Sequence, residues 1–342
     1  MAPNPIEGIA LHAIGAGSAS TCYLPYHKTK SWSWVSYWLV QSLFAWIIVP
    51  LLLAITTVPH FFEIIHQTPR NILFTTFLLG ALYGFGGMSF GFATRFIGYS
   101  LTYSISIGLS AVFGTVLPLA IKGNLAGYFE QPGGNIVLAG MIVAIAGVAV
   151  CGWAGFRKEK ELNKNTSFKI RPGLLLAFVA GLLSGIFNLS LEHGQPISDL
   201  AAQHGAGIFE DNAKLIVATS GCFAVNFIWF IILFFKEKRA KEFSSANYQQ
   251  SGILRKNLLW SALGGTMWCF QFFFYGLGHV EMGRFQFASW VIHMSMLIFF
   301  SFLVGIGMKE WKNISRKTYL LLIVAMVTLA VSFCILSYGT MS

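Results

Sequence analysis

The chain has 342 residues, of which 55% are hydrophobic and 11% are charged, and its mean hydropathy is +0.65. Soluble domains carry about 25% charged residues, so this composition excludes an ordinary soluble protein and indicates a membrane protein. The formal net charge of +10 does not indicate nucleic-acid binding. Most basic residues lie in every second loop between the apolar stretches described below, which is a pattern of membrane topology. No basic, aromatic-interleaved domain is available to hold a nucleic-acid backbone.

About ten apolar stretches follow one another along the chain, and each can cross a hydrocarbon core of about 30 Å as a helix. We predict membrane-spanning helices over residues 6–26, 34–58, 71–93, 97–120, 135–155, 172–191, 212–235, 258–278, 285–308 and 318–338. The segment Met1–Gly8 contains no Lys or Arg. It therefore lacks the charged start of a signal peptide, and we expect the first helix to be retained.

The distribution of basic residues predicts the topology. Of the 23 Lys and Arg, 19 fall in the odd-numbered loops and three in the even-numbered loops, while Lys214 opens a span. Basic residues in short loops stay cytoplasmic. We therefore expect odd loops inside, where they meet anionic lipid headgroups, and both termini outside. The loop Glu192–Asp211 is acidic, without Lys or Arg, and is expected outside.

Five spans in each half place the two halves in opposite orientations. We therefore predict an all-α integral membrane protein built from two inverted five-helix repeats, as is typical of secondary transporters. The first repeat covers residues 1–155, the basic cytoplasmic linker 156–171, and the second repeat 172–342. A shift of 185 residues places the third span on the eighth, so that Gly80 meets Gly265 and Tyr83 meets Trp268.

Glycines recur along the third span at positions that share one helix face. They are Gly80, Gly84, Gly87 and Gly91. Small residues let helices approach closely in lipid, so this face predicts helix packing. A sliding surface between moving helices is compatible with the same pattern.

The eighth span carries the strongest candidate for a binding face. Trp268, Gln271 and Tyr275 follow at i, i+3 and i+7 and share one side of the helix. An amide flanked by an indole and a phenol suits a neutral sugar, because rings stack on C–H surfaces and the amide bonds hydroxyls. Trp290 in the ninth span, Asn188 in the sixth and Tyr83 in the third are predicted to contribute.

Proton coupling requires a titratable group near that face. None of the 13 carboxylates is predicted at mid-membrane, which leaves His293 and His12 as the deepest titratable side chains. A neutral histidine hydrogen-bonded between helices is the alternative reading. Glu192 and Glu281, at span ends, are the reserve candidates. Scattered histidines and five cysteines without CxxC spacing predict no metal or other cofactor site.

These residues resemble the L-rhamnose–proton symporter family. The resemblance covers nearly the whole chain and is densest over 263–311, in Leu263–Gly265, Gln271–Tyr275, His293–Ser295 and Lys309–Trp311. It implies a ten-helix fold of the drug/metabolite transporter superfamily in the bacterial inner membrane. It also implies import of L-rhamnose, or of L-lyxose or L-mannose, with a proton. At Gly86 an amide is expected in the family, so the exact sugar stays open.

Two alternatives remain from the sequence. The first is a drug or metabolite exporter of the same superfamily, and the second is a symporter for a different deoxy sugar. An exporter of cationic compounds would be expected to place a carboxylate in its cavity, and no carboxylate is predicted at mid-membrane. An enzyme is not predicted, because the chain has no phosphate-binding GxxxxGK[ST] loop and no GxSxG elbow.

Overall fold

The computed structural model describes residues 3–97, 99–123, 125–162, 170–243 and 252–342. This part of the chain forms helices and turns without any strand, so the all-α prediction is confirmed. The longer helices are α1 (Pro5–Thr21), α2 (Trp34–Leu43), α3 (Val49–Thr57), α5 (Arg70–Ile97), α6 (Tyr99–Lys122), α8 (Gly134–Leu162), α9 (Ile170–His193), α11 (Asp211–Lys236), α12 (Ile253–Glu281), α13 (Ser289–Gly307) and α14 (Arg316–Met341). Three short helices are α4 (Phe61–Gln67), α7 (Leu125–Glu130) and α10 (Gln195–Gln203).

Eight helical segments of the described chain are long and apolar enough to cross a membrane. Two of the ten predicted spans, α1 and α12, are not among them. α1 has 17 residues. α12 has 29 residues, but glycines and polar side chains such as Gln271 and His279 make it less apolar. Much of α12 is buried against other helices, so its composition reflects protein contacts as well as lipid.

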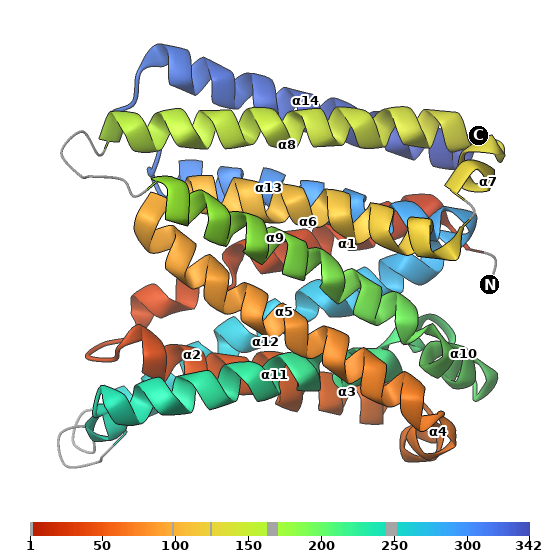
Figure 1. The fold of residues 1–342 in the computed structure, drawn as a ribbon, viewed down its shortest axis with the longest axis horizontal. Helices are drawn as coiled ribbons and strands as arrows, with labels where there is room; N and C mark the ends of the chain where they lie inside the picture. The colour runs from red at the N-terminus through yellow and green to blue at the C-terminus, as the bar shows by residue number, and fades with distance from the viewer. Residues whose placement is uncertain (1–2, 98, 124, 163–169, 244–251) are drawn as a thin grey trace.

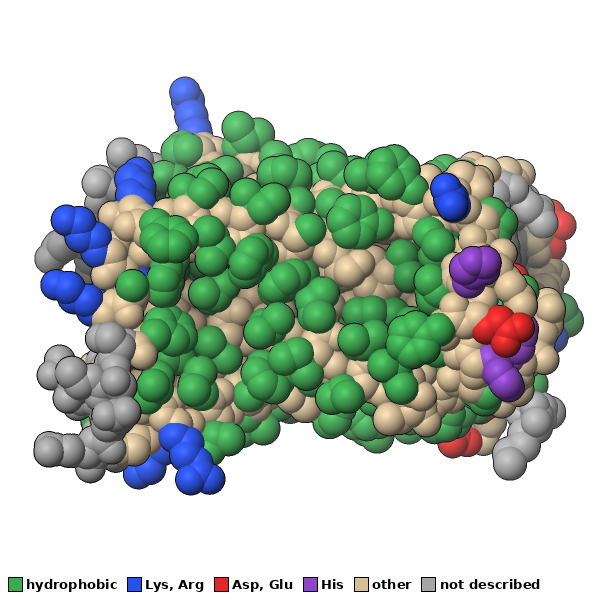
Figure 2. Space-filling view, turned by 90° about the horizontal axis from the view of Figure 1, so that it is seen from below, with side chains coloured by type: hydrophobic (Ala, Val, Ile, Leu, Met, Phe, Trp, Pro, Cys, Tyr) green, Lys and Arg blue, Asp and Glu red, His purple; other side chains and the backbone are tan. Residues whose placement is uncertain are grey.

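The surface carries a wide apolar belt between two polar ends (Figure 2). Large apolar side chains such as Phe74, Ile228 and Val324 are more than half exposed, which suits contact with lipid tails. Lys and Arg side chains gather at one end of this view, whereas Asp, Glu and His side chains lie at the other. Both chain termini lie at a common end of the bundle (Figure 1).

The second predicted span, 34–58, is one continuous helical segment with a local irregularity. Between α2 and α3 the residues Phe44–Ile48 form a π turn, labelled η2. In it the Val49 N–H donates to the carbonyl of Phe44, five residues earlier. Pro50 has no N–H to offer the carbonyl of Trp46, four residues earlier. The regular helical hydrogen-bond ladder therefore breaks at this point.

The start of α2 is fixed at the basic end of the molecule. The Ser33 side chain caps the helix by accepting from the Ser36 N–H. Glu242 in turn accepts from the Ser33 N–H at 2.8 Å and from its hydroxyl at 3.0 Å. Burial raises the pKa of the Glu242 carboxyl, but these hydrogen bonds and Arg239 outweigh it, so the net pKa is lowered.

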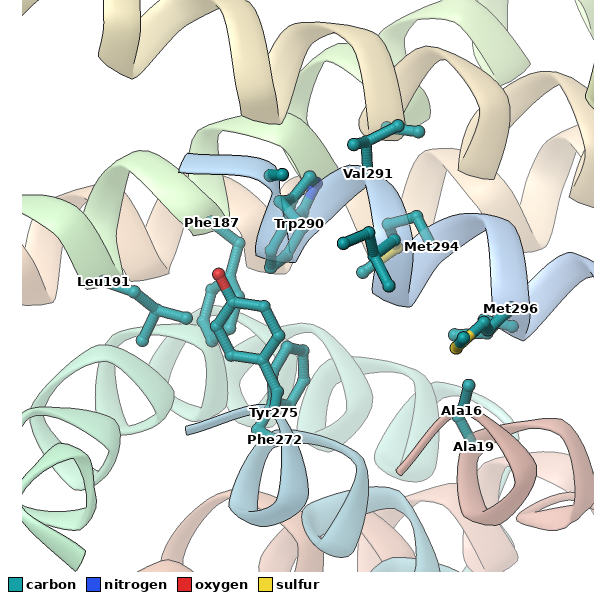
Figure 3. Packing of buried hydrophobic residues seen from close by; sticks show 14 of the residues in the cluster. Ala16, Ala19, Phe187, Leu191, Phe272, Tyr275, Trp290, Val291, Met294 and Met296 are labelled. Carbon is teal, nitrogen blue, oxygen red and sulfur yellow. The ribbon is translucent and has the colours of Figure 1, made fainter. Parts of the chain in front are cut away.

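The two halves of the chain are interleaved. α1 packs against α12 and α13 of the second half, while α9 packs against α5 and α6 of the first half. α8 and α14 lie side by side along one flank of the bundle (Figure 1). The central helices therefore surround a common core in which both halves supply walls. Figure 3 shows part of this core, with Tyr275 of α12 and Trp290 of α13 close together.

The end that carries the termini is closed by short helices. α4 and α10 lie there (Figure 1), and Phe61 and Ile64 of α4 share a buried cluster with Ile197 and Ala201 of α10. Residues of α3 and α11 complete the cluster. The predicted acidic loop Glu192–Asp211 thus contains a folded helix that covers this end of the bundle.

Candidate functional site

A cavity of about 100 Å³ lies at the centre of the bundle. Its walls come from α1, α2, α5, α6, α9, α11, α12 and α13, so every wall helix brings one face to the same space. Four of the six predicted sugar-binding residues line it: Tyr83, Trp268, Gln271 and Trp290. The structure therefore brings together residues that are more than 200 positions apart in the chain.

The central cavity continues into a wider vestibule of about 590 Å³. The two share lining residues, among them Tyr23, Trp38 and Asn226. The vestibule reaches Leu24 and His27, the residues at the C-terminal end of α11, and Met308 just after α13. These positions adjoin the basic segments at Lys28, Lys236 and Lys309. The cavity therefore opens toward the basic end of the molecule.

The predicted face of α12 divides along its length. Trp268 and Gln271 face the cavity, and Trp268 stacks against Tyr83 of α5 with ring centroids 6.4 Å apart. Tyr275 lies one turn further along and does not line the cavity. Its hydroxyl donates to Asn188 Oδ1 at 2.9 Å. Asn188 Nδ2 donates to the Gly114 carbonyl at 2.8 Å, so these two residues join α12, α9 and α6 behind the cavity.

Trp290 is held in a fixed orientation at the same end of the cavity. Its indole N–H donates to the Ser110 carbonyl of α6 at 2.9 Å, and its ring stands edge-on to Tyr275 at 5.5 Å. A Cβ atom added at Gly114 would lie 2.2 Å from the Trp290 Nε1. Only glycine at position 114 lets the indole approach α6 this closely. The end of the cavity toward the termini is therefore tightly packed.

The two predicted proton-coupling histidines lie close together behind the tightly packed end of the cavity. His12 of α1 and His293 of α13 are fully buried, with ring centroids 5.7 Å apart. Each ring also lies 5.4 Å from the ring of Tyr275. None of the four imidazole nitrogens makes a hydrogen bond within the described residues.

The reserve acids occupy different surroundings. Glu192 lies at the C-terminal end of α9 and is partly buried, within electrostatic range of Tyr275. Glu281 ends α12 and accepts a hydrogen bond from the Asn4 N–H at 2.8 Å in an exposed position. Glu192 therefore lies within electrostatic range of the ring that contacts both histidines.

The glycine face of α5 serves two purposes. A Cβ atom at Gly80 would lie 2.0 Å from the Ala218 carbonyl, and one at Gly84 would lie 2.9 Å from Val225. Both glycines therefore permit close packing on α11. Gly87 and Gly91 have open space where a Cβ would be, and both line the vestibule. The second half of the face borders the cavity instead of another helix.

The chain is similar along its whole length to transporters of one family. A model of the family described as L-rhamnose-proton symport protein matches residues 1–342. The chain is 33% identical over 341 residues to the L-rhamnose-proton symporter of Klebsiella pneumoniae subsp. pneumoniae, covering 98% of both chains. It is 32% identical to that of Salmonella typhi, covering 98% of both, and 31% identical to that of Mannheimia succiniciproducens, covering 99% of both.

The chain belongs to the L-rhamnose-proton symport protein family. Membership in this symporter family makes the protein a transporter and not an enzyme, and its apolar helices and bacterial relatives make it a multi-pass bacterial membrane protein. Within the described residues, no three His, Cys, Asp or Glu side chains are grouped so that they could hold a metal ion.

One buried ion pair of this symporter was not predicted from the sequence. Asp211 Oδ1 lies 2.7 Å from Lys214 Nζ, and both side chains are almost fully buried. The Ser198 hydroxyl of α10 donates to the same carboxylate oxygen at 2.9 Å, and Lys214 donates to Gln195 Oε1 at 2.7 Å. The i, i+3 spacing at a helix start was the available signal, but burial depends on how α10 folds over α11.

Most other residues of the cavity wall were also not predicted from the sequence, and three of them have buried polar atoms without a partner within the described residues. Trp38 of α2, Trp46 of η2 and Asn226 of α11 line the cavity, together with the expected α12 face. Asn226 is an amide in the middle of an apolar span, which is the same signal that singled out Gln271. The tryptophans gave no comparable signal, because aromatic residues also form belts at membrane interfaces. Gly86, the predicted departure from the family pattern, lies in the cavity wall as well.

Proposed function

We propose that this protein imports L-rhamnose together with a proton across the bacterial inner membrane. L-lyxose and L-mannose are the further substrates to be compared. The observation that carries the proposal is a central cavity with an amide, indoles and phenols in its wall and no charged lining side chain among the described residues. Such a wall suits a neutral polyhydroxylated ligand. The family membership and the names of the relatives support the same substrate.

The proposed architecture has ten spans in two inverted repeats, and it counts as spans both the 17-residue α1 and the less apolar α12. In this scheme α1 corresponds to α9, α2 to α11, α5 to α12, α6 to α13 and α8 to α14. The helix contacts support it in pairs. α5 packs on α9 as α12 packs on α1, and α5 packs on α11 as α12 packs on α2.

Two glycines that the sequence shift pairs with each other support the same repeat. A Cβ at Gly80 of α5 would lie 2.0 Å from the Ala218 carbonyl of α11, and a Cβ at Gly265 of α12 would lie 2.4 Å from the Gln41 carbonyl of α2. α11 and α2 correspond to each other in the repeat. Equivalent glycines therefore permit equivalent close contacts, as a pseudo-two-fold axis requires.

The orientation follows from charge. The basic end is proposed to face the cytoplasm and its anionic lipid headgroups, which places both termini outside. The vestibule then opens to the cytoplasm, while Tyr275, Asn188 and Trp290 close the cavity on the outer side. This structure would be the inward-open state, and import requires a second state in which the outer side opens.

Reporter fusions test this orientation. A reporter fused after Ser342 should report the outside, and one inserted between Lys158 and Lys164 should report the cytoplasm, because basic loops are retained there. The same reporter inserted near Lys312, in the loop before α14, serves as a second cytoplasmic control. Cytoplasmic signals from both Ser342 and the 158–164 segment would contradict the inverted arrangement.

Gln271 is proposed to bond sugar hydroxyls, with Trp268, Trp290 and Tyr83 as the surrounding rings. The variant Gln271→Leu keeps the bulk of the side chain but removes its donors and acceptor. We expect sugar affinity to fall by about 1–3 kcal/mol for a hydroxyl left unpaired, measured as the KM for uptake. Trp268→Ala should also weaken uptake by removing a stacking surface.

The control for this prediction is Gln203→Leu, at an exposed position at the end of α10, which should leave the KM unchanged. Amounts of folded protein are compared for all variants by size-exclusion chromatography. Parental kinetics in both Gln271→Leu and Trp268→Ala would remove this face of α12 from the sugar site.

The proton is proposed to bind His293, with His12 as the second choice and Glu192 in reserve. His293 is preferred because it lies one turn from Trp290 on α13, close to the proposed sugar site. Coupled transport requires that binding at the sugar site change binding at the proton site. Tyr275 could link the two sites, because it contacts Trp290 and both histidines. The alternative function, export of a drug or metabolite, would not require Tyr275, Trp290 and the histidines to couple a sugar site to a proton site.

Sugar-induced proton movement tests the proposal directly in cells. Adding L-rhamnose to a lightly buffered suspension of cells that express the protein should alkalinise the medium as protons enter with the sugar. An exporter that exchanges its substrate for protons would not respond to external L-rhamnose in this way. Absence of alkalinisation with L-rhamnose, L-lyxose and L-mannose would contradict the proposed function.

A further inference from the structure

The cavity wall beside α12 contains three buried polar atoms that have no hydrogen-bond partner within the described residues. Trp38 Nε1 and Trp46 Nε1 are buried indole donors, and Asn226 Oδ1 is a buried amide acceptor. None of the three makes a hydrogen bond within the described residues, although all three side chains line the central cavity. A buried donor or acceptor without a partner is costly. Such atoms at a cavity wall point to a ligand that supplies the missing partners.

The irregular backbone of the second span aligns the two indoles. Residues eight positions apart on a regular α-helix differ by about 80° around its axis. The π turn Phe44–Ile48 makes a wider turn, which reduces this offset and brings Trp46 toward the face that carries Trp38. Both rings therefore reach one cavity. π turns of this kind are frequent at functional sites.

The rings are also fixed in orientation. Trp46 stands edge-on between Trp38, at 5.8 Å, and Trp268, at 5.4 Å. Trp38 stacks on Phe230 of α11 with centroids 5.8 Å apart. An indole has a single N–H donor, so packing of the ring fixes the direction of the donor before any ligand arrives. Pre-organised donors of this kind lose little entropy on binding.

Asn226 is fixed by its own hydrogen bonds. Its Nδ2 donates to the Gly84 carbonyl of α5 at 3.2 Å and to the Cys222 carbonyl at 3.0 Å. Both amide protons are thus used by the protein, which leaves Oδ1 as the polar atom of this side chain without a partner within the described residues. The two donors and this acceptor match the hydrogen-bonding pattern of hydroxyl groups, each of which can accept and donate.

We propose that Trp38, Trp46 and Asn226 form a second wall of the sugar-binding site. The Trp38 and Trp46 N–H groups donate to two sugar hydroxyls, and Asn226 Oδ1 accepts from a hydroxyl. Gln271 binds the sugar from the adjoining wall formed by α12. This inference rests on the proposed function, because it takes a neutral sugar as the ligand. It assigns substrate contacts to α2 and η2, which belong to the second span, and to α11, which is the span that corresponds to it in the proposed repeat.

Isothermal titration calorimetry with L-rhamnose on the purified full-length protein tests this wall. Trp38→Phe and Trp46→Phe each keep an aromatic ring but remove the N–H. Each should weaken binding about 5- to 10-fold, the size of one neutral hydrogen bond. Asn226→Leu should weaken it at least as much. The matched control is Trp153→Phe on α8, where the indole is 58% exposed and remote from the cavity lining, and its affinity should equal that of the parent.

A second measurement covers variants that fail to fold. In parent protein labelled with ¹⁵N-tryptophan, at least two of the ten indole N–H signals should move downfield when L-rhamnose is added. Parental affinity in both Trp→Phe variants, or no indole shift at saturating sugar, would overturn this inference and leave the proposed function standing. No binding of L-rhamnose, L-lyxose or L-mannose by the parent protein would overturn both.

Discussion

The variant His293→Gln should lose gradient-driven sugar accumulation altogether. A neutral sugar that enters with one proton carries one positive charge inward, and each charge gains about 2.3 kcal/mol per 100 mV. At roughly 150 mV this is about 3.5 kcal/mol, which supports accumulation of a few hundredfold. Glutamine can hydrogen-bond but cannot take up a proton at physiological pH. Exchange of labelled sugar at equal concentrations on both sides should continue, because it needs no net proton movement.

The measurement compares accumulation and exchange in the same proteoliposomes. His66→Gln, an exposed histidine on α4, serves as the matched control and should accumulate sugar as the parent does. If His293→Gln still moves protons with sugar at the parental ratio, His293 does not carry the proton. His12→Gln and Glu192→Gln are then the next variants, followed by Asp211→Asn at the buried ion pair.

The variant Lys214→Ala should strongly destabilise the protein. It leaves the Asp211 carboxylate buried, with the Ser198 hydroxyl as its one remaining side-chain hydrogen-bond partner among the described residues. Removing one member of a buried ion pair typically costs about 3–5 kcal/mol, because the remaining charge has no compensation. The expected result is a large drop in the melting temperature of the purified protein, with loss of order first at the end capped by α10.

Two further variants separate the buried charge from other effects. In the double variant Asp211→Asn, Lys214→Met both charges are gone, so most of the lost stability should return. Lys236→Ala, at the exposed C-terminal end of α11, should leave the melting temperature unchanged. A double variant as unstable as Lys214→Ala would show that packing at this position, and not the unpaired charge, determines the loss.

Much of this fold could be predicted from apolar length and loop charge alone. The predicted span 212–235 compares with α11, Asp211–Lys236, and the predicted span 285–308 with α13, Ser289–Gly307. These elements follow from local properties, since a helix in lipid must satisfy all its backbone hydrogen bonds internally. The face of α12 that carries Trp268 and Gln271 could be predicted for the same reason, because helical spacing is a local property.

The remaining features depend on contacts between distant segments. Trp46 reaches the cavity through a π turn, which shifts the face on which a residue lies and has no simple periodic signature. Tyr275 shares the predicted face of α12 but bonds Asn188, so it lies behind the cavity. Asp211 is buried because α10 folds over the end of α11. Each of these outcomes is decided by tertiary packing.

Uptake of labelled L-rhamnose into proteoliposomes is the most direct test of proton-coupled sugar import by this protein. Purified protein is reconstituted, and uptake is followed with an inward proton gradient, without a gradient, and with a proton ionophore. We expect accumulation above the external concentration only with the gradient, and its collapse when the ionophore is added. Uptake that merely equilibrates in all three conditions, or no uptake at all, would contradict proton-coupled sugar import.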